Sequence, residues 1–262
     1  MVEIPTFYQG GVINRFFNIF SKRESYNIDS FYAMIIHTPV IVLKSFPYGD
    51  TSLIARCFSE DKGKISLIVK GARSKKSPKS AQFQPLSYID VIYYNKSNRD
   101  LQVLSKVNFR ESWPRILDDL RSITLSMAIL ELTEKTLSDE DPHPRLFATL
   151  VNVFRAFNEK KADPNILFWF YECALLTHLG FQPILDQLEF PGLTLTDPNA
   201  GPNSGLILAS LLAEDIENLP TDIVTPIDRK IIGDYLWTLL RYHFDGLAKI
   251  KSMDVARKIL AD

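Results

Sequence analysis

The sequence predicts an α+β protein in which a small β-barrel is followed by a mostly α-helical domain. Short segments with alternating apolar and polar residues fill residues 34–110, and no helix-length periodicity interrupts them. After Trp113 the apolar residues recur at helical spacing. The formal net charge is −1 overall but divides into +8 over residues 34–110 and −9 over residues 111–262. We therefore expect an extension over residues 1–33, a barrel domain over 34–110 and a helical domain over 111–262.

Turn residues separate the predicted strands. A tight turn is expected over Glu60–Gly63, a second turn over Phe46–Asp50 and a polar loop over Gly71–Ser80, while Pro39 indicates an edge or a bulge. The expected strands lie at residues 35–44, 51–59, 64–70, 86–94 and 100–107. Five strands without a long helix are typical of the closed barrel of the oligonucleotide-binding (OB) type.

The predicted helices follow apolar residues at a period near 3.6. Asp163-Pro164 is a good helix start, because aspartate caps the first turn and proline fits the first helical position. A Pro/Gly/Asn-rich stretch over residues 182–205 is expected to be a loop. The expected helices lie at residues 115–137, 146–157, 164–180, 228–244 and 253–260.

The first 33 residues carry an apolar stripe at roughly helical spacing, from Val12 to Phe20. One interpretation is a short amphipathic helix that docks on a partner or on the body of the protein. The other is an appendage, or translated sequence upstream of a true start at Met34. Both interpretations remain open at this point.

Catalytic and metal-binding patterns are missing from the sequence. Gly63-Lys64 lacks the earlier glycine and the following hydroxyl of a phosphate-binding loop. The four histidines are scattered, and Cys57 and Cys173 are too far apart to form a CxxC pair, so we expect buried free thiols. No apolar run reaches the roughly 18 residues of a membrane span, and no secretory signal begins the chain. The sequence therefore predicts a non-enzymatic, soluble and cytoplasmic protein.

A basic run between Lys62 and Lys79 is the strongest functional signal, because it holds seven Lys/Arg residues and no acidic residue. Cations on a flexible loop can follow a phosphate backbone without reading sequence. The candidate DNA-binding residues are Lys62, Lys64, Lys70, Arg73, Lys75, Lys76 and Lys79, with Arg99 from a nearby turn. Base-stacking candidates are Phe46, Tyr48, Phe58, Phe83, Tyr93 and Tyr94. The alternative is a solvated charged loop with these aromatics in the barrel core.

Several segments together resemble the bacterial RecO family of DNA repair and recombination proteins. They are Val42–Ile54, Phe58–Lys64, Val69–Ser77, Gln84–Leu86, Ala174–Phe181 and Leu247–Ser252. The resemblance implies an OB domain and a helical domain that bind single- and double-stranded DNA and anneal complementary strands. It also implies that the protein, with RecR, helps RecA to load onto DNA coated with single-stranded DNA-binding protein (SSB). The C-terminal tail of SSB would be a partner, and the protein would join the nucleoid during repair.

Two departures from the family pattern affect what is carried over. Many members bind structural zinc through four cysteines, but here Leu188 and Pro191 stand where the first pair would be, and no cysteine follows Cys173. We therefore expect no cofactor, with a degenerate zinc-finger region at about residues 182–206. The family often has basic residues near the site associated with the SSB tail, whereas Phe168–Glu172 is aromatic here. No residue is assigned to that contact.

Two other interpretations share the same electrostatics. The first is an OB-type RNA-binding or ribosome-associated protein whose acidic helices are only structural. The second is a protein–protein adaptor whose basic loop meets an acidic partner. Charge alone does not separate these from a recombination mediator.

Overall fold

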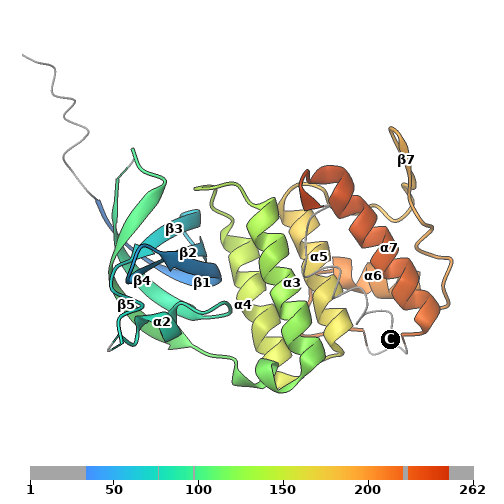
Figure 1. Cartoon of the computed structure of the whole chain (residues 1–262). Helices are drawn as coiled ribbons and strands as arrows, with labels where there is room; N and C mark the ends of the chain where they lie inside the picture. Colours follow the sequence, from blue (N-terminus) through green and yellow to red (C-terminus); the bar gives the residue numbers. More distant parts are fainter. Residues whose placement is uncertain (1–33, 76, 97, 221–223, 248–262) are drawn as a thin grey trace, which may run out of the picture. The chain divides into compact units, whose positions relative to one another are not determined.

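The computed structural model describes residues 34–75, 77–96, 98–220 and 224–247. Within these residues a five-stranded barrel is followed by a group of helices (Figure 1). The extension at 1–33, Lys76 and the helix expected at 253–260 lie outside the described residues.

The five strands form a closed barrel in the order β1-β2-β3-β5-β4. Neighbouring strands are antiparallel except for β3 and β5, which run parallel. This arrangement confirms the predicted α+β fold with an OB-type barrel. The strands are β1 (Met34–Tyr48), β2 (Ser52–Ser59), β3 (Gly63–Val69), β4 (Tyr88–Asn95) and β5 (Leu101–Glu111).

Strand β1 is longer than the sequence predicts because it serves two neighbours. Its first half pairs with β4 and its second half, from Val40 onward, pairs with β2. The bulge falls between Val42 and Lys44 rather than at Pro39, where β1 pairs only with β4. The turn expected at Phe46–Asp50 is displaced, since Phe46 and Tyr48 still pair with β2, and Gly49 makes the turn with a φ of +55°.

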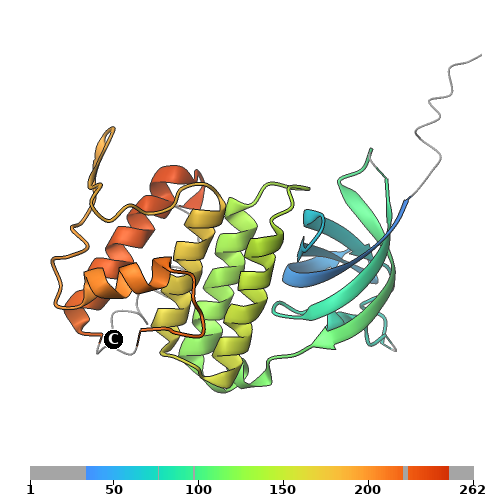
Figure 2. The same cartoon turned by 180° about the vertical axis from the view of Figure 1, so that it is seen from behind.

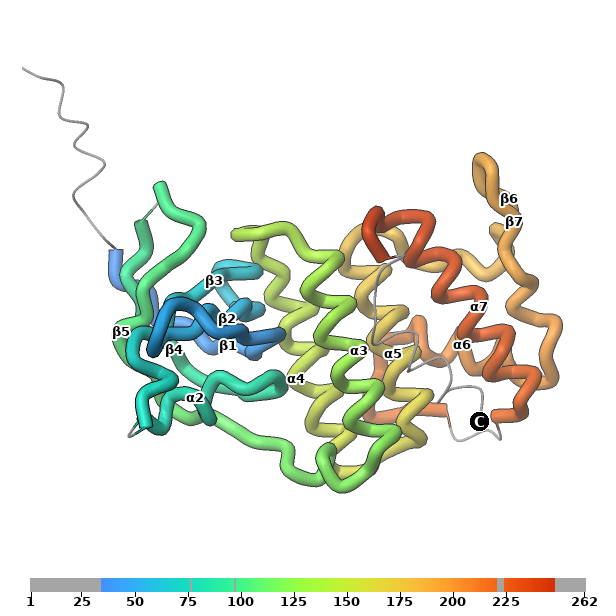
Figure 3. Tube along the Cα trace, viewed as in Figure 1, coloured from blue at the N-terminus to red at the C-terminus, as the bar shows by residue number. Residues whose placement is uncertain are grey.

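The helical part is built around α5, which is buried along almost its whole length. Helix α5 packs against α3, α4, α6 and α7, and α3, α4 and α5 lie side by side in Figure 3. The helices are η2 (Pro114–Asp118, 3-10), α3 (Leu120–Thr136), α4 (Pro144–Glu159), α5 (Pro164–His178), α6 (Ser204–Leu212) and α7 (Pro226–His243). A four-residue helix, α2 (Lys79–Gln82), precedes β4.

Three features of the helical part differ from the predictions. The helix expected at residues 115–137 is divided, because Asp119 leaves the helical conformation and its side chain accepts a hydrogen bond from the Ser122 N–H at 2.7 Å. Helix α6 has no counterpart among the predicted elements. The predicted loop over 182–205 also contains a short hairpin of β6 (Glu189–Phe190) and β7 (Leu193–Thr194).

The core consists of two clusters. One fills the barrel interior, where the free thiol of Cys57 is buried. The other is the helical core, and it includes Ile41, Phe58 and Tyr88, whose side chains leave the barrel wall on its outer side. The Phe58 ring meets the Phe147 ring of α4 edge to face, at a centroid distance of 5.4 Å. Part of the outer barrel surface is therefore packed against the helices. Figure 2 shows the barrel beside these helices from behind.

Gly63 allows a close approach between the barrel and the segment that follows α3. Its φ is +63°, and a Cβ atom there would lie 2.1 Å from the carbonyl oxygen of Asp141. One residue later, the Glu140 N–H donates to the Lys64 carbonyl oxygen at 3.0 Å. Any side chain at position 63 would force this backbone contact apart.

Candidate nucleic-acid interface

Strand β3 divides the predicted basic run between two ends of the barrel. Lys62 and Lys64 lie at the start of β3, whereas Lys70 follows its end. A strand of 7 residues separates these ends by about 20 Å. Arg99 belongs with the first end, because Arg99 and Lys64 line the same small cavity. Figure 1 shows the β4–β5 turn at the top of the barrel and α2 near its lower end.

Lys64 is a structural residue in this fold. It is 7% exposed, and its ammonium donates to the carbonyl oxygens of Glu134 and Leu137 at 2.9 and 2.6 Å. A carboxylate oxygen of Asp139 lies 3.4 Å away. Burial lowers the pKa of Lys64, and the Asp139 charge opposes that shift. These contacts join β3 to the end of α3, and because the Lys64 ammonium is buried in them we do not expect it to contact phosphates.

Two more cations of the barrel are also neutralised by the helical part. The Arg56 guanidinium binds the Asp139 carboxylate at 2.8 Å, and the Lys44 ammonium binds Glu134 at 2.9 Å. Two acidic residues thus balance three basic ones, so part of the charge asymmetry seen in sequence is consumed inside the protein. Apart from Lys64, none of these residues is a candidate from the sequence, where the opposite charge of the two halves is the only signal of such pairing.

The basic loop is defined here by four described cations, Lys70, Arg73, Lys75 and Lys79, and none of them is buried. Lys70, Arg73 and Lys75 are exposed, while Lys79 is half-buried at the start of α2. The Arg73 N–H donates to the Thr51 carbonyl oxygen at 2.7 Å, and its guanidinium donates to the Gly49 carbonyl oxygen at 3.1 Å. These bonds fix the loop beside the β1–β2 turn, with Ala72 buried beneath it.

Three of the six base-stacking candidates are exposed. Phe46 and Tyr48 are 43% and 48% exposed, and their alternate positions place them on one face of β1. Tyr48 directly precedes the turn to which Arg73 is bonded. Tyr94 is 44% exposed but pairs with Ile35, at the other end of β1. The remaining candidates, Phe58, Phe83 and Tyr93, are buried.

Phe46 and Tyr48, which we call the aromatic pair, therefore share one end of the barrel with the basic loop. The structure brings Lys70, Arg73, Lys75 and Lys79 together there and leaves Lys62 and Arg99 at the opposite end. A surface with exposed rings beside cations can stack bases and neutralise phosphates at the same time.

The region of the degenerate zinc finger is packed by apolar side chains. Leu188, Phe190 and Leu193 lie against the helical core, and Leu195 is buried in it. Leucine and phenylalanine offer no zinc ligand, and residues 174–262 contain no cysteine. Among the described residues, no group of three or more His, Cys, Asp or Glu side chains is arranged to hold a metal ion. The residues present do not fit a zinc site.

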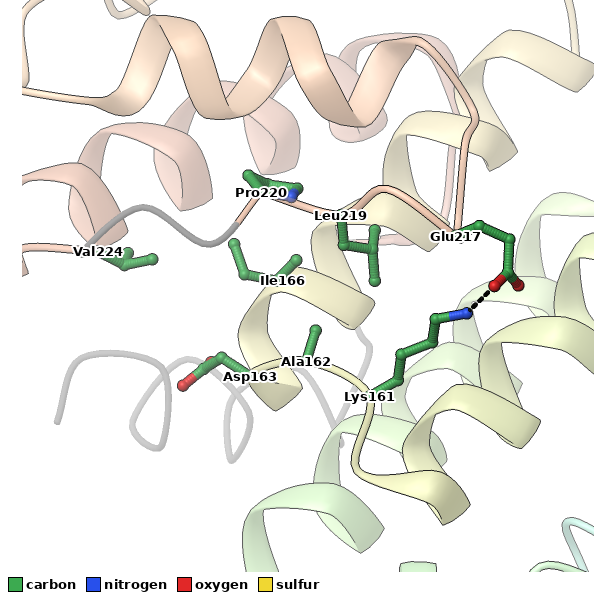
Figure 4. A pocket seen from close by; sticks show the side chains of 8 residues that line it. All are labelled: Lys161, Ala162, Asp163, Ile166, Glu217, Leu219, Pro220 and Val224. Carbon is green, nitrogen blue, oxygen red and sulfur yellow. Dashed lines mark hydrogen bonds and ion pairs between the residues drawn. The ribbon is translucent and has the colours of Figure 1, made fainter.

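The aromatic run Phe168–Glu172 forms the centre of the helical core, where every one of its side chains is buried. A separate cavity of about 310 Å³ lies at the start of α5 (Figure 4). Lys161 lines it, but its ammonium is paired with the Glu217 carboxylate. Within the described ranges, no helix is both long and apolar enough to cross a membrane.

The fold and this surface define a class of protein: an OB barrel joined to a helical domain, with cations and aromatic rings gathered at one end of the barrel. The profile described as "Recombination protein O N terminal" matches residues 34–113, and "Recombination protein O C terminal" matches residues 117–220. The chain belongs to the RecO family, and its role is in DNA repair and recombination.

Relatives along most of the chain agree with this assignment. The DNA repair protein RecO of Salinibacter ruber is 29% identical over 245 residues, covering 86% of this chain and 94% of its own length. RecO of Pelodictyon phaeoclathratiforme is 28% identical over 264 residues, covering 87% and 99%. RecO of Prosthecochloris aestuarii is 30% identical over 159 residues, covering 61% and 60%.

Proposed function

We propose that this protein is a recombination mediator that binds single- and double-stranded DNA and anneals complementary strands. In this proposal it also acts with RecR to assist RecA loading onto SSB-coated DNA. The observation that carries the proposal is the position of the basic loop beside the aromatic pair, on a member of the RecO family. The protein would act in the cytoplasm and join the nucleoid during repair.

The chemistry of this surface suits both DNA forms. Lys70, Arg73 and Lys75 would neutralise phosphates and release counterions, which supplies affinity without sequence preference. Duplex DNA offers its phosphates but no free base face for stacking, because its bases are paired and stacked on one another. A single strand also offers bases, which would stack on Phe46 and Tyr48.

Annealing follows from the same interactions. Two complementary strands repel each other through their phosphates, and cations that neutralise one strand lower this repulsion. Base pairing then supplies the free energy that joins the strands, so the protein needs no bond-breaking chemistry. We infer that the protein is not an enzyme.

The partner proteins are inferred from the family alone. The buried aromatic run Phe168–Glu172 offers no surface to the acidic C-terminal tail of SSB. We therefore propose the tail, RecR and, indirectly, RecA as partners without assigning residues to any of them.

Annealing of complementary strands precoated with SSB tests the proposal. We expect the full chain to accelerate annealing, and a variant with Lys70, Arg73 and Lys75 changed to alanine to be slower at the same protein concentration. The same titration with single-stranded RNA addresses an RNA-binding function. Tighter binding to RNA than to DNA, without annealing of SSB-coated strands, would contradict the proposal.

A further inference from the structure

A groove of about 390 Å³ runs between α2, the end of β5 and η2. Its walls include Ala81 and Gln82 of α2, the helix that begins at Lys79. The groove therefore starts where the basic loop ends, two residues beyond its last cation. Its volume falls in the range of small-molecule pockets, roughly 300–1,000 Å³.

Phe109 stands at this groove as an exposed aromatic side chain. It lies opposite the buried Ile89 in the β4–β5 ladder, yet it is 65% exposed. Arg110 is the extra residue of a bulge that follows Phe109, and bulges redirect neighbouring side chains. Leu117 of η2 is also exposed beside the groove. The exposed ring of Phe109, near the end of β5, is a surface on which another planar ring can stack.

The floor of the groove is rigid. Tyr88 and Trp113 are buried and stacked, with ring centroids 5.8 Å apart and an interplanar angle of 19°. The Trp113 indole N–H donates to the Glu111 carboxylate at 2.9 Å. Leu86, which also lines the groove, holds a φ of +69° that leucine rarely adopts, while its N–H donates to the Val42 carbonyl oxygen. The groove is thus built in advance rather than formed by collapse onto a ligand.

The charges of the groove do not oppose an anionic ligand. Glu111 is the one acidic residue among those that line it, and its carboxylate binds the Arg155 guanidinium at 2.7 Å. Arg110 lies over the Tyr88 ring at 5.2 Å and pairs with Asp90 at 2.8 Å. With Glu111 compensated and the basic loop adjacent, the electrostatic potential at this end of the barrel favours a polyanion.

We propose that this groove binds an unstacked nucleobase of single-stranded DNA whose phosphates lie on the basic loop, with Phe109 stacking on the base. The inference rests on the proposed DNA binding and adds to it a site that holds one base. A base in a duplex is paired and stacked, so only a single strand can supply this ligand. The competing occupant is an apolar side chain of a partner protein. Such a side chain would need apolar contact area in the groove but not an aromatic ring at position 109.

The test compares Phe109→Leu with Phe109→Trp in the full chain. Leucine keeps an apolar side chain but has no ring, whereas tryptophan keeps the ring. Binding would be measured by fluorescence anisotropy with a single-stranded oligonucleotide, the same oligonucleotide made of abasic sites, and a duplex. Because Phe109 is exposed, neither change should alter the thermal unfolding temperature, and circular dichroism checks this.

We expect Phe109→Leu to weaken single-strand binding about five-fold or more, the effect of losing one stacked base. Phe109→Trp should bind as the wild type does, and the two variants should be equal on the duplex and on abasic DNA. Equal single-strand affinity of wild type and Phe109→Leu would overturn the inference. The alanine variant of Lys70, Arg73 and Lys75 distinguishes the proposed DNA binding from the proposed base site. If this variant binds DNA more weakly but Phe109→Leu binds as the wild type does, the DNA binding stands and only the base site is rejected.

Discussion

The ammonium of Lys64 lies 2.6 Å from the carbonyl oxygen of Leu137, and both residues are buried where the barrel meets the end of α3. A cation at the C-terminal end of a helix meets the negative end of the helix dipole and the carbonyl oxygens that have no partner within the helix. Lys64 therefore stabilises α3 and holds the barrel against it. This relationship gives a residue from the basic run a structural role.

Replacing Lys64 with methionine should destabilise the protein without changing its affinity for DNA. The change leaves the carbonyl oxygens of Glu134 and Leu137 buried without their donor, and we expect the free energy of unfolding to fall by about 2 kcal/mol. Urea unfolding monitored by circular dichroism measures this. Lys70→Met is the matched control, because it removes an exposed lysine from the other end of β3. Weaker DNA binding by Lys64→Met at unchanged stability would return Lys64 to the interface.

Acid should destabilise the protein through carboxylates that are paired in the folded state. A hydrogen bond from Arg155 lowers the pKa of Glu111, and one from Ser122 lowers the pKa of Asp119. A folded-state pKa below the unfolded value stabilises the protein above the unfolded pKa, and this contribution is lost as the pH falls through the folded pKa. The free energy of unfolding should thus be level above about pH 5 and fall below it, since unfolded Glu and Asp titrate near 4.3 and 3.9.

The variants Glu111→Gln and Asp119→Asn should show a shallower loss of stability in acid than the wild type. Asp186→Asn, a change at an exposed carboxylate, is the control and should keep the steepness of the wild type. Urea unfolding at intervals from pH 7 to pH 3 gives the comparison. A decline of equal steepness in all four proteins would show that these pairs do not control acid stability.

Changing Phe46 and Tyr48 to alanine should weaken binding to single strands by about 25-fold or more, about five-fold for each lost ring, while leaving duplex binding unchanged. The two rings stack on bases and contact no phosphate in this account. Because the variant keeps every cation of the basic loop, the salt dependence of DNA binding should not change. Tyr94→Ala is the matched control, because it removes an equally exposed ring from the other end of β1. Equally weakened binding in Tyr94→Ala would point to a second binding surface near the β4–β5 turn.

The protein should fold without zinc. Apolar side chains pack the region at about residues 182–206, and no cysteine there offers a thiolate to a metal ion. Elemental analysis of the purified protein should find well below one zinc per chain, and a chelator should leave the thermal unfolding temperature unchanged. Stoichiometric zinc, or unfolding by the chelator, would contradict this expectation.

The alternation of apolar residues was sufficient to predict the five strands, because each inward-facing side chain is set by the two-residue period of a strand. The same period places Lys64 on the outer face of β3, where a lysine normally reaches solvent. Its environment depends instead on oxygen atoms some 70 positions away. Two of them are the backbone carbonyl oxygens of Glu134 and Leu137, which no residue type in the sequence can indicate. Long-range contacts of this kind explain why Lys64 is buried, whereas the basic run forms two separate groups because the length of β3 lies between them.

Two further differences have local causes. The predicted fifth strand ends at Val107 and leaves Phe109 outside it, although the strand continues to Glu111 by pairing with Tyr88. Helix α6 is apolar over most of its surface and only 9 residues long, so it has no contrasting polar face to reveal a helical period.

The salt dependence of DNA binding tests the central claim most directly, which is that the basic loop holds the phosphates. Affinity for one single-stranded oligonucleotide would be measured at several salt concentrations for the wild type and for the alanine variant of Lys70, Arg73 and Lys75. A second variant, with Lys135, Arg145 and Lys230 changed to alanine, removes the same charge from exposed positions on the helices. We predict that the slope of log K against log salt shrinks by about 0.7 for each phosphate that the loop variant no longer neutralises and is unchanged in the helix variant. An unchanged slope in the loop variant, or an equal reduction in both, would contradict the account.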